Sequence, residues 1–472
     1  KPSYSLNRFN YDDMANLLIP RAVGYSAGLI NYFFRGKLDF VKDPGDATKY
    51  IIKNLGKEAM TGTFTLYYDD KDDNRQPVPG AQWTNLTIAA GKDSTPVYFT
   101  PPTNPAPKAD GEYMLVFKGT LGQETNAVVG HWVEPPLVVV GQSGNQAFRQ
   151  TLIKRGGVWV KGKMEGLGFL SGASYSTATG VSANGSVVVG YSGNQAFRWT
   201  RAEGMVGLGF MALRNFGSTA PDYYSGAFDI SADGKVIVGY GNSPNVYDSE
   251  AFRWTQADGM VGIGFLGDPT KQNNIYSAAY GISDDGKVIV GVGRQIFNVV
   301  PQAFRWTAAG GMAPLGVLPH LPGSPSTDAS WAYKTSADGN IVVGESNQQA
   351  FYWTQAEGLV GLEFLGSVSN GDVNYASDIS DDGSVIVGGF STADGTNRKA
   401  LCWIKAGGIT RLKSLSGTTY SEANGVSPDG SIIVGMSDYE AVIWTQEGDI
   451  MTRLGFLPGA SNSVAFDISA IN

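Results

Sequence analysis

The hydrophobic pattern of this chain repeats along its C-terminal two-thirds, from Leu137 onward. Short apolar runs there alternate with Asp-Gly or Asn-Gly pairs and with other turn residues. One phrase, Ala-Phe-Arg-Trp-Thr or a close variant, recurs at spacings of 49, 55, 52, 47, 50 and 41 residues. Its copies begin at Ala147, Ala196, Ala251, Ala303, Ala350, Ala400 and Ala441. A period near 50 residues is typical of solenoids and propellers.

A second phrase lies upstream of the first and contains a turn. It reads Ser-x-Asp/Asn-Gly, then apolar residues that end in glycine, as in SADGKVIVG from Ser231. A run of the AFDIS type precedes it, and a run such as GMVGLGF follows the tryptophan phrase. Because x-Asp-Gly favours a tight hairpin, each unit predicts four short antiparallel strands, which is one propeller blade. A β-solenoid is the alternative, but its coils are usually shorter and lack hairpin turns.

The two ends of the repeat region indicate a closed ring. The first unit starts at Leu137 as LVVVG and lacks the AFDIS strand, whereas an AFDIS run at residues 465–469 follows the last complete unit. We predict that this C-terminal strand pairs with the first VVVG strand, which removes an exposed sheet edge. The expected fold is therefore all-β, with a seven-bladed β-propeller over residues 137–472.

The first 136 residues follow another pattern. Seven strand-like runs separated by turn signals fill residues 37–136, which predicts an immunoglobulin-like β-sandwich. Residues 1–36 are expected to be an N-terminal arm or helix. The apolar stretch 17–34 contains Pro20, Arg21 and Asn31, so it is a poor membrane span. No signal peptide is visible, and we expect one to have been removed already.

Composition narrows the possible chemistry. Glycine accounts for 63 of 472 residues, only 17% of residues are charged, and the net charge is −8. The chain has no basic run, which argues against nucleic-acid binding. One cysteine, Cys402, rules out an internal disulfide, and two histidines, His131 and His320, argue against zinc sites and histidine-dependent catalysis.

The repeated phrases resemble those of bacterial extracellular HAF-repeat proteins, which are named for a His-Ala-Phe motif. In this chain glutamine or glutamate replaces the histidine, at Gln146, Gln195, Glu250, Gln302 and Gln349. The resemblance covers about 70% of the chain. It implies a propeller-like fold and secretion or display on the outer cell surface, and it supplies no catalytic residues. The N-terminal module resembles bacterial surface sandwich modules.

One recurring position is a candidate for channel chemistry. Two residues before each serine, on the predicted innermost strand, the chain carries Asp467, Gly180, Asp229, Gly281, Lys334, Asp378 and Gly425 in ring order. Three carboxylates and one lysine could bind a cation such as calcium or position a polar ligand. Alternatively they cap strands or bind channel water. The serines themselves are expected to bond to backbone at their turns, because a nucleophile does not recur seven times.

A second group of candidates lies on the predicted loops. The connections on one face of the ring are long and carry aromatic residues that could contact a glycan or a protein. These are Tyr223, Tyr224, Tyr247, Tyr276, Trp331, Tyr375 and Tyr420. The acidic run at residues 69–74 faintly resembles a calcium loop but lacks its glycine and terminal glutamate, so a solvated hairpin tip is the preferred interpretation.

Three functions are compatible with these observations. The first is a secreted surface protein, a non-catalytic adhesion or binding module that recognises a glycan or protein through the long-loop face. The second is a structural subunit of an extracellular assembly, which would form homo-oligomers through residues 1–36. The third is a polysaccharide-active enzyme that uses the channel carboxylates, although no catalytic constellation is evident.

Overall fold

The structure is a computed structural model, and it describes most of the chain as two compact units, Lys1–Pro135 and Pro136–Ile471. The description leaves out residues 1–35, 44–45, 70–74, 101–112, 134–136, 156–157, 212–222, 244–248, 268–274, 295–299, 321–327, 364–370, 406, 416–419, 446–450 and 470–472. The predicted arm, the acidic run after Asp69 and Tyr247 therefore lie outside the described residues. The described part is all-β and contains no α-helix.

The N-terminal unit has two antiparallel sheets. A two-stranded sheet pairs β1 (Leu38–Asp43) with β2 (Asp46–Asn54), and a four-stranded sheet has the order β4 (Arg75–Ile88), β3 (Met60–Asp69), β5 (Tyr113–Leu121), β6 (Glu124–Val133). Phe64 and Phe117 are fully buried in their shared core. The immunoglobulin-like topology of this unit stays a prediction.

One expected strand of the N-terminal unit is missing. Residues 96–100, PVYFT, contribute only an isolated bridge, in which Val97 and Tyr50 exchange two backbone hydrogen bonds. Pro96 has no N–H to donate, so the ladder does not extend along the chain in that direction. Six of the seven expected runs therefore lie in strands.

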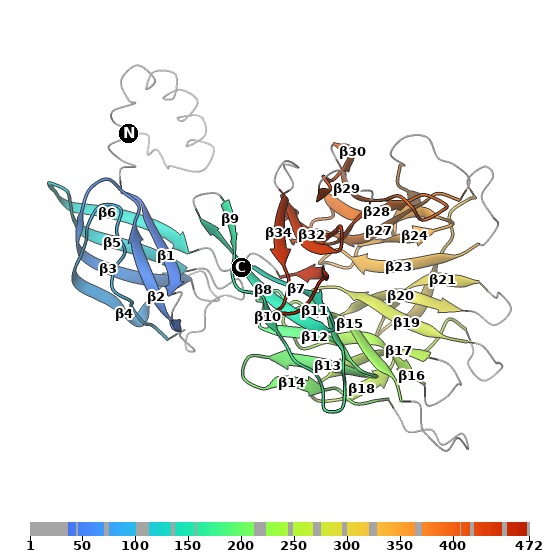
Figure 1. The fold of residues 1–472 in the computed structure, drawn as a ribbon. Helices are drawn as coiled ribbons and strands as arrows, with labels where there is room; N and C mark the ends of the chain where they lie inside the picture. Colours follow the sequence, from blue (N-terminus) through green and yellow to red (C-terminus); the bar gives the residue numbers. More distant parts are fainter. Residues whose placement is uncertain are drawn as a thin grey trace, which may run out of the picture. The chain divides into compact units, whose positions relative to one another are not determined.

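The described residues of the C-terminal unit form seven consecutive antiparallel sheets, arranged like the blades of a propeller (Figure 1). Six sheets have four strands each: β11 (Ser176–Val181), β12 (Val187–Ser192), β13 (Gln195–Thr200), β14 (Gly204–Gly207); β15 (Ser225–Ile230), β16 (Ile237–Asn242), β17 (Ser249–Thr255), β18 (Gly259–Gly262); β19 (Ser277–Ile282), β20 (Val288–Arg294), β21 (Pro301–Thr307), β22 (Gly311–Gly316); β23 (Ser330–Thr335), β24 (Ile341–Ser346), β25 (Gln349–Thr354), β26 (Gly358–Gly361); β27 (Val373–Ile379), β28 (Val385–Ser391), β29 (Arg398–Ile404), β30 (Gly408–Arg411); β31 (Ser421–Val426), β32 (Ile432–Ser437), β33 (Glu440–Thr445), β34 (Met451–Gly455).

The remaining sheet joins the two ends of this unit. It contains β7 (Leu137–Ser143), β8 (Gln146–Arg155), β9 (Val158–Lys161), β10 (Glu165–Gly166) and β35 (Ser463–Ile468). The C-terminal strand β35 pairs with β7, so the pairing predicted from the sequence is confirmed. The innermost strands β11, β15, β19, β23, β27, β31 and β35 contact one another in succession, and β35 contacts β11 again. The contacts of the inner strands thus form a closed circuit.

Each inner strand has a β-bulge at the same place. In β15 the ladder pairs Ala227 with Gly239 and Asp229 with Val238, so that Phe228 is skipped. The other inner strands skip the equivalent residue. A bulge sets two residues of one strand opposite one of its partner and redirects their side chains.

The bulge explains the glycine that ends every VIVG run. A Cβ added at Gly239 would collide with the carbonyl oxygen of Gly226 and crowd Ala227. The same collision occurs at Gly141, Gly190, Gly291, Gly344, Gly388 and Gly435. Glycine is therefore required there because the bulged strand brings its backbone too close for any side chain.

Apolar side chains of the tryptophan phrase pack between neighbouring sheets. Phe197 and Trp199 of β13 are buried in one cluster with Val138 and Val140 of the preceding sheet. The hydroxyls at the tight turns behave as expected. Ser231 Oγ accepts the backbone N–H of Val236 at 3.0 Å and donates to Asp233 at 2.8 Å.

Candidate functional site

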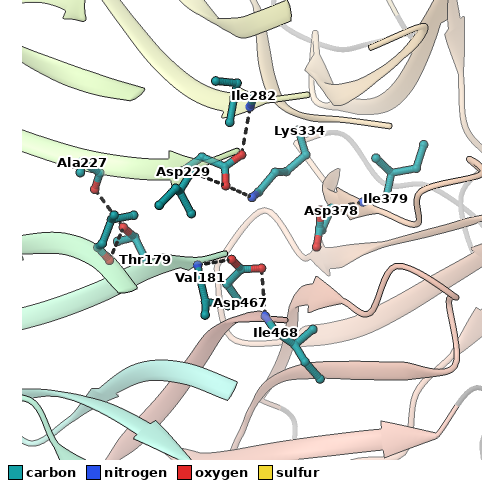
Figure 2. A network of polar contacts seen from close by, with 12 residues as sticks. Thr179, Val181, Ala227, Asp229, Ile282, Lys334, Asp378, Ile379, Asp467 and Ile468 are labelled. Carbon is teal, nitrogen blue, oxygen red and sulfur yellow. Dashed lines mark hydrogen bonds and ion pairs between the residues drawn. The ribbon is translucent and has the colours of Figure 1, made fainter. Parts of the chain in front are cut away.

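The four charged residues predicted for the channel meet at its centre (Figure 2). Lys334 extends from β23, and its Nζ lies 2.8 Å from Oδ1 of Asp229. Asp378 and Asp467 also face this ammonium group, from β27 and β35. All three aspartates are buried. The structure thus brings the predicted residues together, and the lysine occupies the place where the sequence suggested a bound cation.

Each of these aspartates also joins two sheets through backbone hydrogen bonds. Asp229 accepts the N–H of Ile230 in its own strand and that of Ile282 in the next sheet, both at 2.9 Å. Asp467 bonds Ile468 and Val181 in the same way, and Asp378 bonds Ile379 and Val426. The next sheet always carries glycine at the equivalent position, namely Gly281, Gly180 or Gly425. The carboxylates are therefore clamps between neighbouring inner strands.

The electrostatics of this cluster are dominated by burial and by Lys334. Burial raises the pKa of Asp378 to about 7, although the Lys334 ammonium opposes this shift. Burial likewise raises the pKa of Asp467. Burial alone would lower the pKa of Lys334, but the three carboxylates outweigh it and hold that pKa above its ordinary value. Lys334 is therefore charged and compensated from several sides.

Lys334 and the three aspartates around it form the floor of the channel. Above this floor the channel widens into a cavity of about 530 Å³. Its wall contains the residue skipped at every bulge: Phe466, Thr179, Phe228, Tyr280, Tyr333, Ser377 and Asn424. Tyr191, Thr177, Glu345, Tyr375 and Lys334 complete the lining. We call this cavity the funnel. Tyr191 and Glu345 lie near the ends of the second strands β12 and β24, so the funnel opens on the side of the turns that follow those strands.

The aromatic side chains of the funnel form a connected arc. The ring centroids of Tyr191 and Phe228 are 6.3 Å apart, those of Phe228 and Tyr280 are 5.6 Å apart, and those of Tyr280 and Tyr333 are 6.0 Å apart. Phe228 also stacks on Tyr240 at 5.1 Å. Burial raises the pKa of both Tyr280 and Tyr333, so these phenols stay neutral. Each ring is half-buried and keeps part of its surface open.

Polar residues of the wall are committed to the backbone of the next sheet. Thr179 Oγ1 donates to the carbonyl of Ala227 at 2.9 Å, and Asn424 Nδ2 donates to that of Ala465 at 2.9 Å. These bonds satisfy carbonyls beside the bulges, where the ladder is interrupted. The Thr179 hydroxyl and the Asn424 amide N–H are therefore already engaged and are poor donors for a ligand.

Glu345 differs from the three aspartates that surround Lys334. It follows the glycine of the IVVG run in β24 and is half-buried in the funnel wall. Among the described residues no hydrogen bond or ion pair to its carboxylate is found, and burial alone raises its pKa to about 7. Tyr333 and Tyr375 lie near enough to feel its charge. A charged group without a partner in an apolar wall is a candidate for ligand contact.

The opposite end of the channel is narrower. A cavity of about 90 Å³ lies beyond Lys334 and is bordered by Asp284 and Asp381. Burial raises the pKa of both residues, that of Asp381 to about 6. Here the hairpin tips of neighbouring sheets bond in a chain, for example Ala232 N–H to the carbonyl of Asp284 at 3.1 Å. This end is a structural seam between sheets.

The predicted loop aromatics do not form one surface. Tyr375 lines the funnel. Tyr223 packs on Phe210, Tyr224 donates to the Tyr240 hydroxyl at 3.5 Å, and Tyr276 lies under the guanidinium of Arg294. Tyr420 stacks on Tyr439, and Trp331 is half-buried on β23 beside the cross-strand residue Glu345. Because these residues do not share one location, the structure does not support a common role for them in contacting a glycan or a protein.

Sequence reasoning missed the bulged positions and Glu345. The signal was present in the second residue of the AFDIS phrase, which is aromatic at Phe228, Tyr280, Tyr333 and Phe466. Strict alternation along a strand would place this residue and the following one, such as Phe228 and Asp229, on opposite faces of the sheet. Only the bulge directs both side chains into the channel. Glu345 occurs in one copy, so no repeat marks it.

Neither a metal centre nor a membrane-spanning helix is found in the described residues. No group of three or more His, Cys, Asp or Glu side chains there is arranged to hold a metal ion, and calcium binding stays a prediction. No helix in the same residues is long and apolar enough to cross a membrane.

No family model and no curated protein sequence matches the chain. Solved structures do match. They include an oligogalacturonate lyase in complex with manganese, with 12% identity, 68% of this chain and 85% of that chain covered, and a TM-score of 0.38. The Cps50 (Swd1) β-propeller domain from Myceliophteria thermophila has 10% identity, coverages of 70% and 99%, and a TM-score of 0.38. Porphyromonas gingivalis dipeptidyl peptidase 4 has 10% identity, coverages of 91% and 61%, and a TM-score of 0.35.

These comparisons correct the function expected from the sequence. The matched structures include a lyase, a hydrolase and peptidases, which contradicts the assignment of this propeller-like protein to a non-catalytic adhesion module. A fold of this kind is compatible with many functions, and function resides in the site. At identities of 9–12% to these enzymes, no activity, substrate or metal is transferred to this chain.

Proposed function

We propose that the protein binds a small organic ligand in the funnel at the centre of its propeller. One observation carries this proposal. The half-buried carboxylate of Glu345, which has no partner among the described residues, faces an aromatic-lined cavity of about 530 Å³. Ligand sites are typically concave, mostly apolar and provided with a few polar groups, and cavities of 300–1,000 Å³ hold small molecules.

The bulges support this proposal. A bulge interrupts a ladder and weakens it, yet all seven inner strands have one at the same place. The bulge places the skipped residue in the funnel wall and the following residue at the floor. A repeated deviation that aims side chains into one cavity is more easily understood as a property of a site than as a requirement of the core.

The proposal takes the seven sheets as the seven blades of a closed propeller and the N-terminal unit as an immunoglobulin-like module. The pairing of β35 with β7 and the circuit of inner-strand contacts support the first assignment. The repeated phrases support HAF-repeat membership and an extracellular location, both of which belong to this proposal. The alternation of strand runs and turns in residues 37–136 supports the second module.

Titration calorimetry on the full chain tests the funnel. The probes are choline, maltose and benzoate, which represent a cation, a neutral sugar and an anion. Phe228→Leu and Tyr280→Leu remove aromatic rings but keep apolar volume, so the fold should persist, as a melting curve would show. Each variant is expected to weaken about tenfold the binding of whichever of the three probes binds to the parent protein.

Tyr439→Leu is the matched control, because this aromatic residue is exposed and stacks on Tyr420 away from the funnel lining. It should leave binding unchanged. Binding of none of the three probes, or binding that both funnel variants leave intact, would overturn the proposed function.

A further inference from the structure

We infer that the ligand of the funnel is an organic cation of the quaternary or tertiary ammonium class. This inference rests on the proposed function, because it names the chemistry that the funnel selects. It draws on two independent features of the described residues: the sign of the charge and the aromatic wall.

The charge of the site is negative. Lys334 and Glu345 are the charged residues among those that line the funnel. Lys334 is neutralised by Asp229 at 2.8 Å, and two further carboxylates face its ammonium from the floor. Even if both of those carboxylates carry protons, Glu345 adds one negative charge above about pH 7, where its carboxyl group is ionised, and this charge has no partner among the described residues. A cation is therefore attracted, and an anion would meet no available positive group.

The aromatic wall suits a cation with a low hydration energy. Ring faces carry negative electrostatic potential, and rings that surround a cation within about 6 Å attract it most strongly when water is excluded. The centroid distances from Phe228 to Tyr280 and from Tyr280 to Tyr333 are 5.6 and 6.0 Å, so the three rings form one continuous aromatic surface. Phe466 and Tyr375 belong to the same lining. An alkylated ammonium group fits such a surface because it has little need for hydrogen bonds.

A neutral sugar is the principal alternative, since sugars also stack on aromatic rings. It would need several free donors and acceptors for its hydroxyl groups, and a buried polar group without a partner is costly. The amide of Asn424 and the hydroxyl of Thr179 already donate to carbonyls of the next sheet. The hydroxyls of Tyr280, Tyr333 and Ser377 remain in the lining for a sugar, so the choice of a cation over a sugar rests on the charge of Glu345.

The decisive experiment compares choline with its neutral isostere 3,3-dimethylbutan-1-ol by titration calorimetry on the full chain. The two compounds share shape and hydroxyl group and differ in one charge. We expect choline to bind at least tenfold more tightly. Equal affinity of the two compounds would overturn the inference.

Variants locate the charge that is responsible. Glu345→Gln preserves the shape of the side chain, and we expect it to weaken choline binding about tenfold while leaving the affinity of the isostere unchanged. Glu203→Gln is the control, because Glu203 is exposed and pairs with Arg198 outside the funnel. If Glu345→Gln binds choline as tightly as the parent protein, the inference fails.

Further probes separate this inference from the proposed function. Maltose or benzoate could bind to the parent protein while choline does not, and Phe228→Leu could abolish that binding. This result would refute the inference of a cationic ligand and support the funnel as a ligand site. Trimethyllysine and phosphocholine, tested beside choline, distinguish a methylated side chain and a lipid headgroup from a free solute. When choline binds more tightly than the neutral isostere, still tighter binding of trimethyllysine or phosphocholine would identify the source of the ammonium group.

Discussion

The floor of the channel and the wall of the funnel both contain buried carboxylates, but their surroundings are opposite. Each aspartate of the floor accepts two backbone N–H groups, one from its own sheet and one from the next, and faces Lys334. Glu345 in the wall accepts none from the described residues and stands among aromatic rings. The aspartates of the floor have partners within the protein, whereas Glu345 has none among the described residues.

This difference teaches that burial and a raised pKa do not by themselves identify a binding residue. The pKa of Asp378 and that of Glu345 both rise to about 7 through burial. Only the hydrogen-bond partners separate the two residues. Four substitutions sharpen the contrast, and the free energy of unfolding is the quantity measured in each.

The largest effect is expected for Lys334→Met. Removal of the only cation of the floor leaves three buried carboxylates without compensation, which costs about 3–5 kcal/mol at pH 8. The loss should be smaller at pH 5, because the pKa values of Asp378 and Asp467 rise further when Lys334 no longer opposes the effect of burial, and both residues then bind protons. Urea denaturation at both pH values measures the difference. Lys235→Met, at an exposed pair with Asp233, should change stability by less than about 1 kcal/mol. Equal losses at pH 5 and pH 8 would contradict the role given to Lys334.

Gly239→Ala tests the bulge that underlies both regions. The new Cβ would collide with the backbone of Gly226, and we expect a loss of about 2–3 kcal/mol. The control is Gly130→Ala, where the added carbon meets only Met114 Sδ at 3.9 Å. A Gly239 variant as stable as this control would show that the bulge relaxes easily. Urea denaturation of both variants measures this difference in stability.

Asp378→Asn tests the clamp role of the floor. An amide has one acceptor oxygen, so it cannot bond both Ile379 and Val426 as the carboxylate does. One buried N–H then loses its partner, and we expect a loss of about 1–3 kcal/mol in denaturation experiments. If the variant keeps full stability, the floor carboxylates are not clamps.

Glu345→Gln should raise the free energy of unfolding, whereas the other three substitutions lower it, and its effect should be the smallest of the four. The pKa of Glu345 in the folded state, about 7, exceeds its ordinary value of 4.5, so the folded chain holds a proton that the unfolded chain releases. The contribution to stability is therefore present below pH 4.5 and is lost as pH rises through 7. The difference between 4.5 and 7 corresponds to about 3 kcal/mol, and solvent screening reduces this because the side chain is only half-buried. The variant should therefore be about 1–2 kcal/mol more stable than the parent at pH 8, and nearly equal at pH 4. Thermal unfolding across this pH range measures the effect, and destabilisation at pH 8 would assign Glu345 a structural role.

The repeated parts of the site could be predicted from the sequence, and the unique parts could not. Asp229, Lys334, Asp378 and Asp467 were found because they occupy one position of a phrase that recurs in every unit. Phe228 and its equivalents occupy the preceding position but were missed, because alternation along a strand assigns neighbours to opposite faces. The bulge that cancels this rule is visible only in the pairing of Ala227 and Asp229 with the adjacent strand.

By itself, the sequence determined the strands of the repeat, their hairpins and the pairing of the C-terminal strand with the first VVVG strand, since periodicity and turn chemistry are local properties of the chain. Tertiary structure alone decided that Lys334 is neutralised from three other sheets and that Glu345 remains without a partner among the described residues. The reason is physical. Charge compensation and burial depend on distances between strands that lie far apart in the sequence, and those distances exist only after the ring has closed.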